Sequence, residues 1–425
     1  MQIEGIIFSG IWYLIFIWFL LKWRGGISST RILGLFTAKV LGTFALQWLF
    51  TYYYTDRSTA DIYRFFDDGI LLNQVFYENP IHFFKIIFNL YSDQEAFRSL
   101  YFEQMNAWIK PFDSGIYNDN HFMIKVNALL AFLSFGYYEV HGLFFSFLAF
   151  IGIKWCTESL IDSDNDKNLA ITLAVLFPSS LVWMSGGLKE ALLIFGIGAF
   201  LKVNFAHFNP KLTSLTLAAI SLLILFSLKI YFIAALIPAF AVHALREKQN
   251  IKRLNQVLIW TGILLIGSYM GYLAGFDIIE YIVRKQNDFL NHVQVISPGS
   301  SFDMPYLKES ILSVIASIPQ ALANVLFRPY IYEVNTLPES LMFLENLIIA
   351  ITIVFSTIRL FRKPDSSKFH FWIILFILPV LILTGMVTPV FGAIMRYRSP
   401  AIVLLLIILI PYLRSFWLKL NYNRS

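Results

Sequence analysis

The chain has 425 residues, of which 57% are hydrophobic and 14% are charged. An average soluble protein carries about 25% charged and about 45–50% apolar residues, so this composition excludes an ordinary cytosolic enzyme, a disordered chain and a disulfide scaffold. The net charge of +6 is better explained by lysine and arginine on the cytoplasmic side of a membrane than by a nucleic-acid partner. The composition therefore predicts a polytopic membrane protein.

Eleven apolar stretches approach the length of about 20 residues that crosses a bilayer. They lie at residues 3–21, 32–54, 139–157, 169–188, 190–204, 212–228, 230–245, 255–275, 340–361, 370–388 and 400–418. The first lacks the basic segment and the cleavage site of a signal peptide, so we expect it to be retained. The predicted fold class is all-α, a transmembrane helical bundle of about 11 spans in a single integral membrane domain, residues 1–425.

Basic loops predict the orientation, because lysine and arginine accumulate on the cytoplasmic side. Four clusters can lie there together: Lys22, Arg24 and Arg31; Arg246, Lys248, Lys252 and Arg253; Arg359, Arg362, Lys363 and Lys368; and Arg414, Lys419 and Arg424. This arrangement puts the N-terminus outside and the C-terminus inside. We therefore expect a multi-pass protein of the cytoplasmic (inner) membrane.

Counting the crossings leaves one apolar stretch, 122–138, that should not span. Lys125, Asn127 and Ser134 make it more polar than the neighbouring stretch 139–157. We expect it to lie in the outer interface or to re-enter the membrane, as the last part of a first outer loop at 55–138.

Amphipathic patterns predict helices inside two outer loops, 55–138 and 276–339. The apolar positions are Ile81, Phe83, Phe84, Ile86, Ile87 and Leu90 in the first loop, and Ile311, Val314, Ile315, Ile318, Leu322 and Leu326 in the second. Such helices can lie in the membrane plane. Soluble loop helices packed on the bundle would show the same pattern.

The first outer loop carries the acidic residues that are the best candidates for catalysis. Asp61, Arg64 and Asp68 share one face if the segment is helical, and Asp67 and Asp68 sit among apolar neighbours. A carboxylate in such surroundings gains proton affinity, which suits a general base. The alternative is a solvated loop whose acids cap a helix or pair with Arg57 and Arg64.

A second charged segment, Pro178 to Ala191, interrupts two apolar runs. Gly186 and Gly187 permit a tight turn. Glu190 would begin the next helix, where an acid is favoured by the helix dipole, but that role does not explain the adjacent Lys189. Charges are costly inside a membrane and are rarely idle there.

Four more cations are expected at the same outer face: Lys229, Arg328, Arg396 and Arg398. Each alone is typical of an anchor that reaches lipid phosphate. Together with the first-loop carboxylates they would suit an anionic lipid-linked substrate. The seven histidines are scattered, so the sequence indicates no metal site and leaves a divalent cation open as a cofactor.

This pattern resembles the GT-C superfamily of membrane glycosyltransferases, and within it the uncharacterised bacterial members. The resemblance rests on the acidic loop after an early helix, the in-plane helices, the charged turn Pro178–Glu190 and the segment Arg396–Pro400 before the last span. The sequence departs from that pattern in an additional N-terminal span and in Lys189–Glu190, which replaces a lone Asp.

The resemblance implies a transferase that takes a sugar from a polyprenyl-phosphate-linked donor and gives it to a glycan or lipid acceptor in polysaccharide biosynthesis at the cell envelope. It would make a first-loop acid the general base: Asp67 or Asp68, with Asp61 one or two turns earlier. Substrate binding would involve Lys189, Glu190, Lys229, Arg328, Arg396 and Arg398, with the cations stabilising the departing phosphate.

Two alternatives remain at this level. A polysaccharide polymerase or O-antigen ligase-like enzyme would share the topology but would transfer whole chains. A lipid-linked glycan transporter would place ionisable residues at the bilayer midplane and would show inverted repeats, whereas the charges here are expected mainly at the outer ends of the spans.

Overall fold

The computed structural model describes residues 3–54, 56–110, 117–205, 212–249, 251–296, 298–362 and 370–422. Within these ranges every regular element is a helix, and the one β-bridge pairs Ser301 with Val390. The all-α prediction is therefore confirmed. Of the predicted features, Thr55 at the start of the first outer loop and the basic residues Lys363, Lys368 and Arg424 lie outside the described residues, as do the side chains of Arg362 and Lys419.

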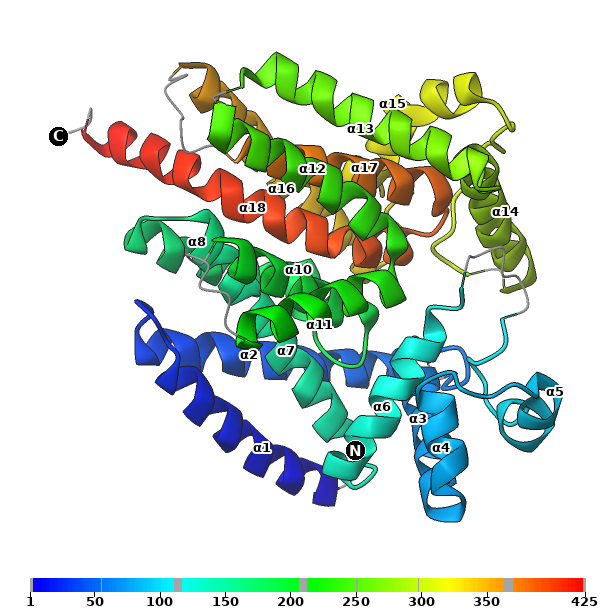
Figure 1. Ribbon diagram of the computed structural model, residues 1–425. Helices are drawn as coiled ribbons and strands as arrows, with labels where there is room; N and C mark the ends of the chain where they lie inside the picture. The colour runs from blue at the N-terminus through cyan, green and yellow to red at the C-terminus, as the bar shows by residue number, and fades with distance from the viewer. Residues whose placement is uncertain are drawn as a thin grey trace. The chain divides into compact units, whose positions relative to one another are not determined.

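Figure 1 shows the helices in chain order. They are α1 (Ile3–Lys22), α2 (Ser29–Trp48), η1 (Leu49–Tyr53), α3 (Asp61–Glu78), α4 (Pro80–Ile87), α5 (Gln94–Phe97), η2 (Arg98–Phe102), α6 (Asn120–Ser134), α7 (Tyr138–Leu160), α8 (Asp164–Leu176), α9 (Pro178–Trp183), α10 (Lys189–Phe205), α11 (Leu212–Leu228), α12 (Ile230–Gln249), α13 (Arg253–Leu273), α14 (Ile278–Ile296), α15 (Ile311–Phe327), η3 (Ile331–Glu333), α16 (Leu337–Arg362), α17 (Phe371–Val387) and α18 (Phe391–Tyr422).

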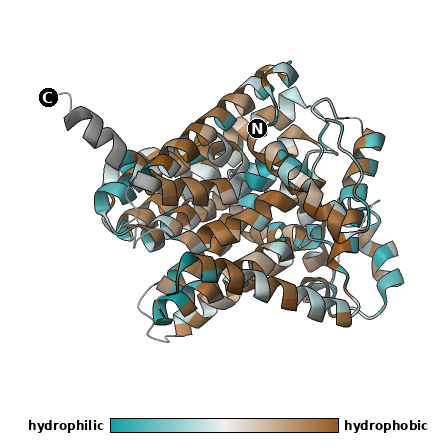
Figure 2. Cartoon of the chain, turned by 90° about the horizontal axis from the view of Figure 1, so that it is seen from above, coloured by the Kyte–Doolittle hydropathy of each residue, from teal (hydrophilic) through white to brown (hydrophobic). Residues whose placement is uncertain are grey.

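Within the part of the chain that the structure describes, seven of the predicted spans correspond to helices that are long and apolar enough to cross a membrane. These segments are Ile3–Lys22, Ser29–Tyr53, Tyr138–Leu160, Ile230–Gln249, Arg253–Leu273, Leu337–Leu360 and Phe391–Arg414. The predicted spans 190–204, 212–228 and 370–388 form α10, α11 and α17, each of 17 residues. Figure 2 shows hydrophobic residues along most helices and hydrophilic residues mainly in loops and at helix ends.

The predicted span 169–188 is wrong as one continuous helix. Helix α8 ends at Leu176, and α9 is a separate helix of six residues that starts with Pro178. Proline lacks an amide hydrogen and fits the first turn of a helix, so it begins a new helix and does not continue the old one. A turn then follows before α10.

Both amphipathic patterns form helices, α4 and α15. Helix α6, in the stretch that was not expected to span, has 15 residues, which is short for a bilayer crossing. Asn127 and Ser134 are buried by the surrounding protein, and both side chains contact His141 of α7.

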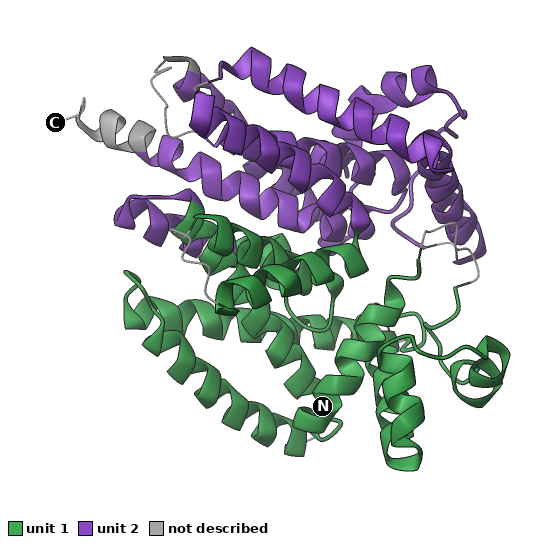
Figure 3. Cartoon of the chain, in the orientation of Figure 1, with its two compact units in different colours: residues 1–159, 175–229 green, residues 160–174, 230–425 purple. Residues whose placement is uncertain are grey.

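The chain forms two compact units (Figure 3). Unit 1 comprises residues 1–159 and 175–229, and unit 2 comprises residues 160–174 and 230–425. The sequence predicted a single domain and contained no signal for this division.

In unit 1, α3 packs closely along α6. Gly69 makes the approach possible, because a Cβ atom there would lie 2.5 Å from the Cβ of Asn127. This contact holds the first-loop helix against α6. In unit 2, α17 packs against α12, α14, α15 and α18, and most of its side chains are buried in that core.

Candidate functional site

Asp68 anchors a loop of unit 1 and is almost completely buried. Its two carboxylate oxygens accept the amide hydrogens of Asn106, at 2.8 Å, and Ala107, at 2.6 Å. One turn earlier on α3, Arg64 donates to the carbonyl oxygen of Asn106 at 3.0 Å. The predicted helical face is confirmed, and two of its members hold the backbone of one loop.

Burial raises the pKa of Asp68 above its usual value, and the amide hydrogens of Asn106 and Ala107 oppose that shift. A raised pKa suits a general base. However, both oxygens already accept hydrogen bonds from the backbone, so a proton transfer at Asp68 would weaken the attachment of the loop.

Asp61 and Asp67 are more accessible. Asp67 forms a bidentate ion pair with Arg57, which donates from Nε to Oδ2 at 2.8 Å and from Nη2 to Oδ1 at 2.6 Å. The Asp67 side chain is 40% exposed. The guanidinium of Arg57 also lies 4.0 Å from the centre of the Tyr63 ring. Asp61 lies 3.8 Å from Arg64 and is 30% exposed.

The strongest concentration of charge in unit 1 surrounds Asp119, directly before α6. Lys110 Nζ lies 2.5 Å from Oδ1 of Asp119, while Lys189 Nζ and Lys229 Nζ lie 2.7 Å and 3.3 Å from Oδ2. Lys189 also donates to Oδ1 of Asn120 at 2.8 Å. We call Lys110, Lys189 and Lys229 around Asp119 the lysine cluster. The sequence predicted two of its members.

Each member comes from a different segment of the chain. Lys110 follows the loop that Asp68 anchors, Asp119 precedes α6, Lys189 begins α10, and Lys229 lies between α11 and α12. An Asp directly before a helix normally accepts an amide hydrogen of the first turn. Asp119 makes no such bond, and its carboxylate forms ion pairs with the lysines instead.

A chain of hydrogen bonds joins the Asp68 loop to the lysine cluster. The carbonyl oxygen of Ala107, whose amide hydrogen binds Asp68, accepts a bond from Nδ2 of Asn120 at 3.0 Å. The other amide atom of Asn120 accepts from Lys189. The Lys189 ammonium also lies 5.1 Å from the centre of the Phe65 ring on α3. Thus the first-loop helix positions the cluster.

The electrostatics of the cluster favour a negatively charged ligand. Burial opposes ionisation of Asp119, but the ammonium groups of Lys189, Lys229 and Lys110 outweigh it and hold the pKa of Asp119 well below its usual value. Burial, together with the charges of Lys229 and Lys110, lowers the pKa of Lys189 to about 7 despite the opposing effect of Asp119. While Lys189 is protonated it shares one carboxylate with Lys110, so positive charge is then in excess even before Lys229 is counted.

The cluster is partly open. The side chains of Lys110 and Lys229 are 23% and 19% exposed, whereas those of Lys189 and Asp119 are 7% and 13% exposed. An anion can therefore reach the first two lysines while Lys189 stays largely desolvated, where its charge acts more strongly.

The remaining predicted site residues show mixed surroundings. Glu190 is fully buried in the first turn of α10. Arg328 of unit 2 lies 3.3 Å from Glu333 and stacks 4.0 Å from the Phe302 ring. Arg396 lies 5.6 Å from the ring of Tyr397.

Arg398 is completely buried in unit 2. It donates to Oδ1 of Asn346 at 2.5 Å and to the carbonyl oxygen of Val325, and it pairs with Glu345 at 3.3 Å. Asn346 in turn donates to the carbonyl oxygen of Arg328 at 2.8 Å. These contacts tie α15, α16 and α18 together, which is an internal bracing role.

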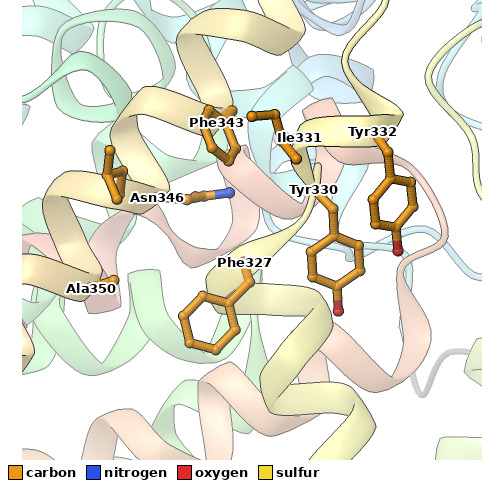
Figure 4. Close-up of a pocket in the computed structure, with 8 residues that line it drawn as sticks. Phe327, Tyr330, Ile331, Tyr332, Phe343, Asn346 and Ala350 are labelled. Atoms are coloured by element: carbon orange, nitrogen blue, oxygen red, sulfur yellow. The ribbon is translucent and has the colours of Figure 1, made fainter.

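Unit 2 also contains an open apolar pocket of about 370 Å³ between the end of α15 and α16 (Figure 4). Its lining is Phe327, Tyr330, Ile331, Tyr332, Phe343, Asn346, Leu347 and Ala350. The rings of Tyr330 and Tyr332 stack at 5.5 Å. With Asn346 the one amide among aromatic and aliphatic neighbours, this lining suits an apolar chain better than a charged group.

Lys110, Asp119 and Asn120 were not among the residues predicted from the sequence. A signal was present in the polar run Asn118-Asp119-Asn120-His121, immediately before an apolar stretch, but such a run usually marks a helix start. Among the residues the structure describes, no group of three His, Cys, Asp or Glu side chains could hold a metal ion. Comparison with family models, with curated proteins and with solved structures finds no match to this chain.

Proposed function

We propose that this chain is a membrane glycosyltransferase that uses a polyprenyl-phosphate-linked sugar as donor, at the outer face of the cytoplasmic membrane. The observation that supports this proposal is the lysine cluster. Three ammonium groups around one carboxylate, in a unit with several apolar helices, match the phosphate of a lipid whose chain lies in the bilayer.

In the proposed reaction, the bond between the sugar and the lipid phosphate breaks, and the phosphate leaves with the bonding electrons. Lys110, Lys189 and Lys229 offset the negative charge that develops on the departing phosphate. Asp119 holds the ammonium groups together before the substrate arrives, so little reorganisation is required during the reaction.

The acceptor hydroxyl attacks the sugar and gives its proton to a carboxylate of the first loop. We propose Asp61 or Asp67 for this role, because their side chains are partly exposed. Asp68 is the less suitable base, because two backbone amides occupy its oxygens. Substrate binding by Arg328 and Arg396, which belong to unit 2, stays a prediction from the sequence. Arg398 has the contacts of a brace.

Binding of the lipid phosphate is the first test. Purified protein in nanodiscs would be titrated with a polyprenyl phosphate and, separately, with the uncharged polyprenol. We expect the phosphate to bind more tightly, and Lys110→Gln or Lys189→Gln to reduce that preference. Lys154→Gln is the matched control, because Lys154 is also a buried lysine of unit 1 but pairs with Glu158. Equal binding of the two lipids would refute the proposal.

Transfer is the second test. A polyprenyl-phosphate sugar with a labelled sugar would be supplied with membrane glycolipids as acceptors, and the labelled product would be separated by size. Addition of single sugars supports a glycosyltransferase, whereas a ladder of long products indicates the polymerase or ligase alternative. Movement of intact labelled donor across the bilayer, without any product, would indicate a transporter.

A further inference from the structure

Lys39 is a completely buried lysine in the middle of α2, which is one of the helices able to span a membrane. Its ammonium donates to the carbonyl oxygens of Ser180, at 2.5 Å, and Met184, at 2.9 Å. Within the described residues no carboxylate lies within ion-pair distance of it. A charged group in a span is costly and is seldom retained without a function.

The two carbonyl oxygens belong to Ser180, the third of the six residues of α9, and to Met184, the residue just beyond its end. Carbonyls at a helix end lack partners within the helix, and a cation next to them is favourable. Lys39 therefore supplies the hydrogen-bond donor that the amides of a further helical turn would have supplied, at the point where α9 ends.

Gly42 adds a second attachment one turn further along α2. A Cβ atom at Gly42 would lie 2.2 Å from the carbonyl oxygen of Leu181, so α2 and α9 approach as closely as their backbones allow. The contact and the two hydrogen bonds of Lys39 fix the end of α9 against α2 in both position and rotation.

The fixed end of α9 leads directly into the turn that delivers Lys189. Gly186 has a φ of 81°, a conformation that glycine adopts without strain, and the amide of Leu188 donates to the carbonyl oxygen of Gly186 at 2.9 Å. Lys189 follows and begins α10. Between the carbonyl that Lys39 binds and Lys189 there is only this turn.

We propose that Lys39 is a positioning residue: by holding the end of α9 it sets where Lys189 meets Asp119. This inference rests on the proposed function only in so far as the lysine cluster binds the lipid phosphate. Lys39 does not touch the cluster, and it acts through the backbone of the turn.

The test compares three variants. Lys39→Met removes the donor and keeps the side-chain length, Lys39→Arg retains a donor, and Gly42→Ala moves α9 while leaving Lys39 in place. Thr43→Val is the control, because Thr43 lies on the same helix but bonds to Ser146 on α7, at 2.5 Å. Folding is checked by size-exclusion chromatography and thermal unfolding.

Two quantities are measured in each variant. The first is the pH dependence of reductive methylation of Lys189, followed by mass spectrometry of that peptide, which reports the surroundings of the amine itself. The second is the affinity for polyprenyl phosphate in nanodiscs. We expect Lys39→Met and Gly42→Ala to change the methylation profile of Lys189. Both should weaken polyprenyl-phosphate binding about tenfold, which corresponds to the loss of one hydrogen bond of a charged group. Lys39→Arg should give values between those of the wild type and Lys39→Met.

A folded Lys39→Met protein with an unchanged Lys189 profile overturns the inference, as does an equal change in Thr43→Val. If Lys39→Met does not fold, Gly42→Ala decides by the same criteria. If Lys189→Gln leaves the lipid affinity unchanged, the proposed function fails, while the methylation profile still reports whether Lys39 positions Lys189.

Discussion

Lys189 at the start of α10 pairs with Asp119 before α6, with 2.7 Å between Nζ and Oδ2. The pair joins two segments that are far apart in the chain, and it leaves the two other lysines of the cluster to share the same carboxylate. The excess of positive charge follows from this arrangement, and it makes the behaviour of the cluster measurable without knowledge of the natural substrate.

Asp119→Asn should destabilise the protein and make its stability depend on anions. Removing the carboxylate leaves three ammonium groups facing one another, and we expect a loss of about 3 kcal/mol, toward the low end for a broken buried pair, because the Asp119 side chain keeps 13% exposure. Added sulfate should bind the variant and restore its melting temperature. Thermal unfolding against sulfate concentration measures this.

Asp166→Asn is the control for that experiment, because Asp166 forms a simple ion pair with one arginine. Its Oδ1 lies 2.8 Å from a guanidinium nitrogen of Arg414, in unit 2. It should not change the sulfate dependence. An Asp119→Asn protein with the stability of the wild type would contradict the electrostatic account of the cluster.

Anion binding should weaken as the pH rises through about 7. The pKa of Lys189 is lowered to about 7, so the amine carries its positive charge below that pH and loses it above. Sulfate is the suitable probe, since it keeps its charge between about pH 5 and about pH 9. Calorimetric titration across this range measures the effect.

Lys189→Met provides the comparison for the pH titration. It should bind sulfate weakly at every pH, without the step near neutrality. A wild-type protein whose affinity stays constant across the range would show that Lys189 is not the titrating group.

Asp67→Asn and Asp68→Asn should separate catalysis from structure. Asp68→Asn places an amide donor next to two backbone donors and should cost about 1–3 kcal/mol of stability. Asp67→Asn breaks an exposed pair and should cost at most about 1 kcal/mol. If Asp67 is the base, its variant loses sugar transfer at normal stability. Melting temperatures and transfer rates on the same samples distinguish the two, and a stable Asp68→Asn protein would refute the anchoring role.

Gly69→Ala should separate α3 from α6. The added Cβ atom would lie 2.5 Å from the Cβ of Asn127, and we expect a loss of about 1–3 kcal/mol from overpacking, together with weaker sulfate binding because α3 supports the cluster. Gly34→Ala is the control, since nothing lies within 4 Å of a Cβ there. Denaturant unfolding of both variants tests this, and equal stabilities would contradict it.

Much of the fold was predictable from hydropathy alone, because a helix that crosses a bilayer requires a long apolar run. The run at 3–21 became α1, and the amphipathic pattern at 311–326 became α15. The end of α8 at Leu176 was not predicted, because two short helices separated by a proline have the same average hydropathy as one span.

The site was predicted only in part. Lys189 and Lys229 were selected because charge is scarce between apolar runs, and the structure places both beside Asp119. Asp68 was selected for its apolar neighbours, but whether a carboxylate among apolar residues is a base or an anchor depends on what meets it. Here it meets two backbone amides from a loop that no local pattern connects to α3.

The apolar runs along the chain indicated a helical protein, and the scarcity of charge limited the positions that could carry a function. Only the tertiary structure decided which of those charges meet. Hydropathy is a property of each segment separately, whereas the lysine cluster forms only when four segments of the chain bring their side chains into contact. That is why Asp119, which looks like a helix cap in the sequence, is the carboxylate that three lysines share.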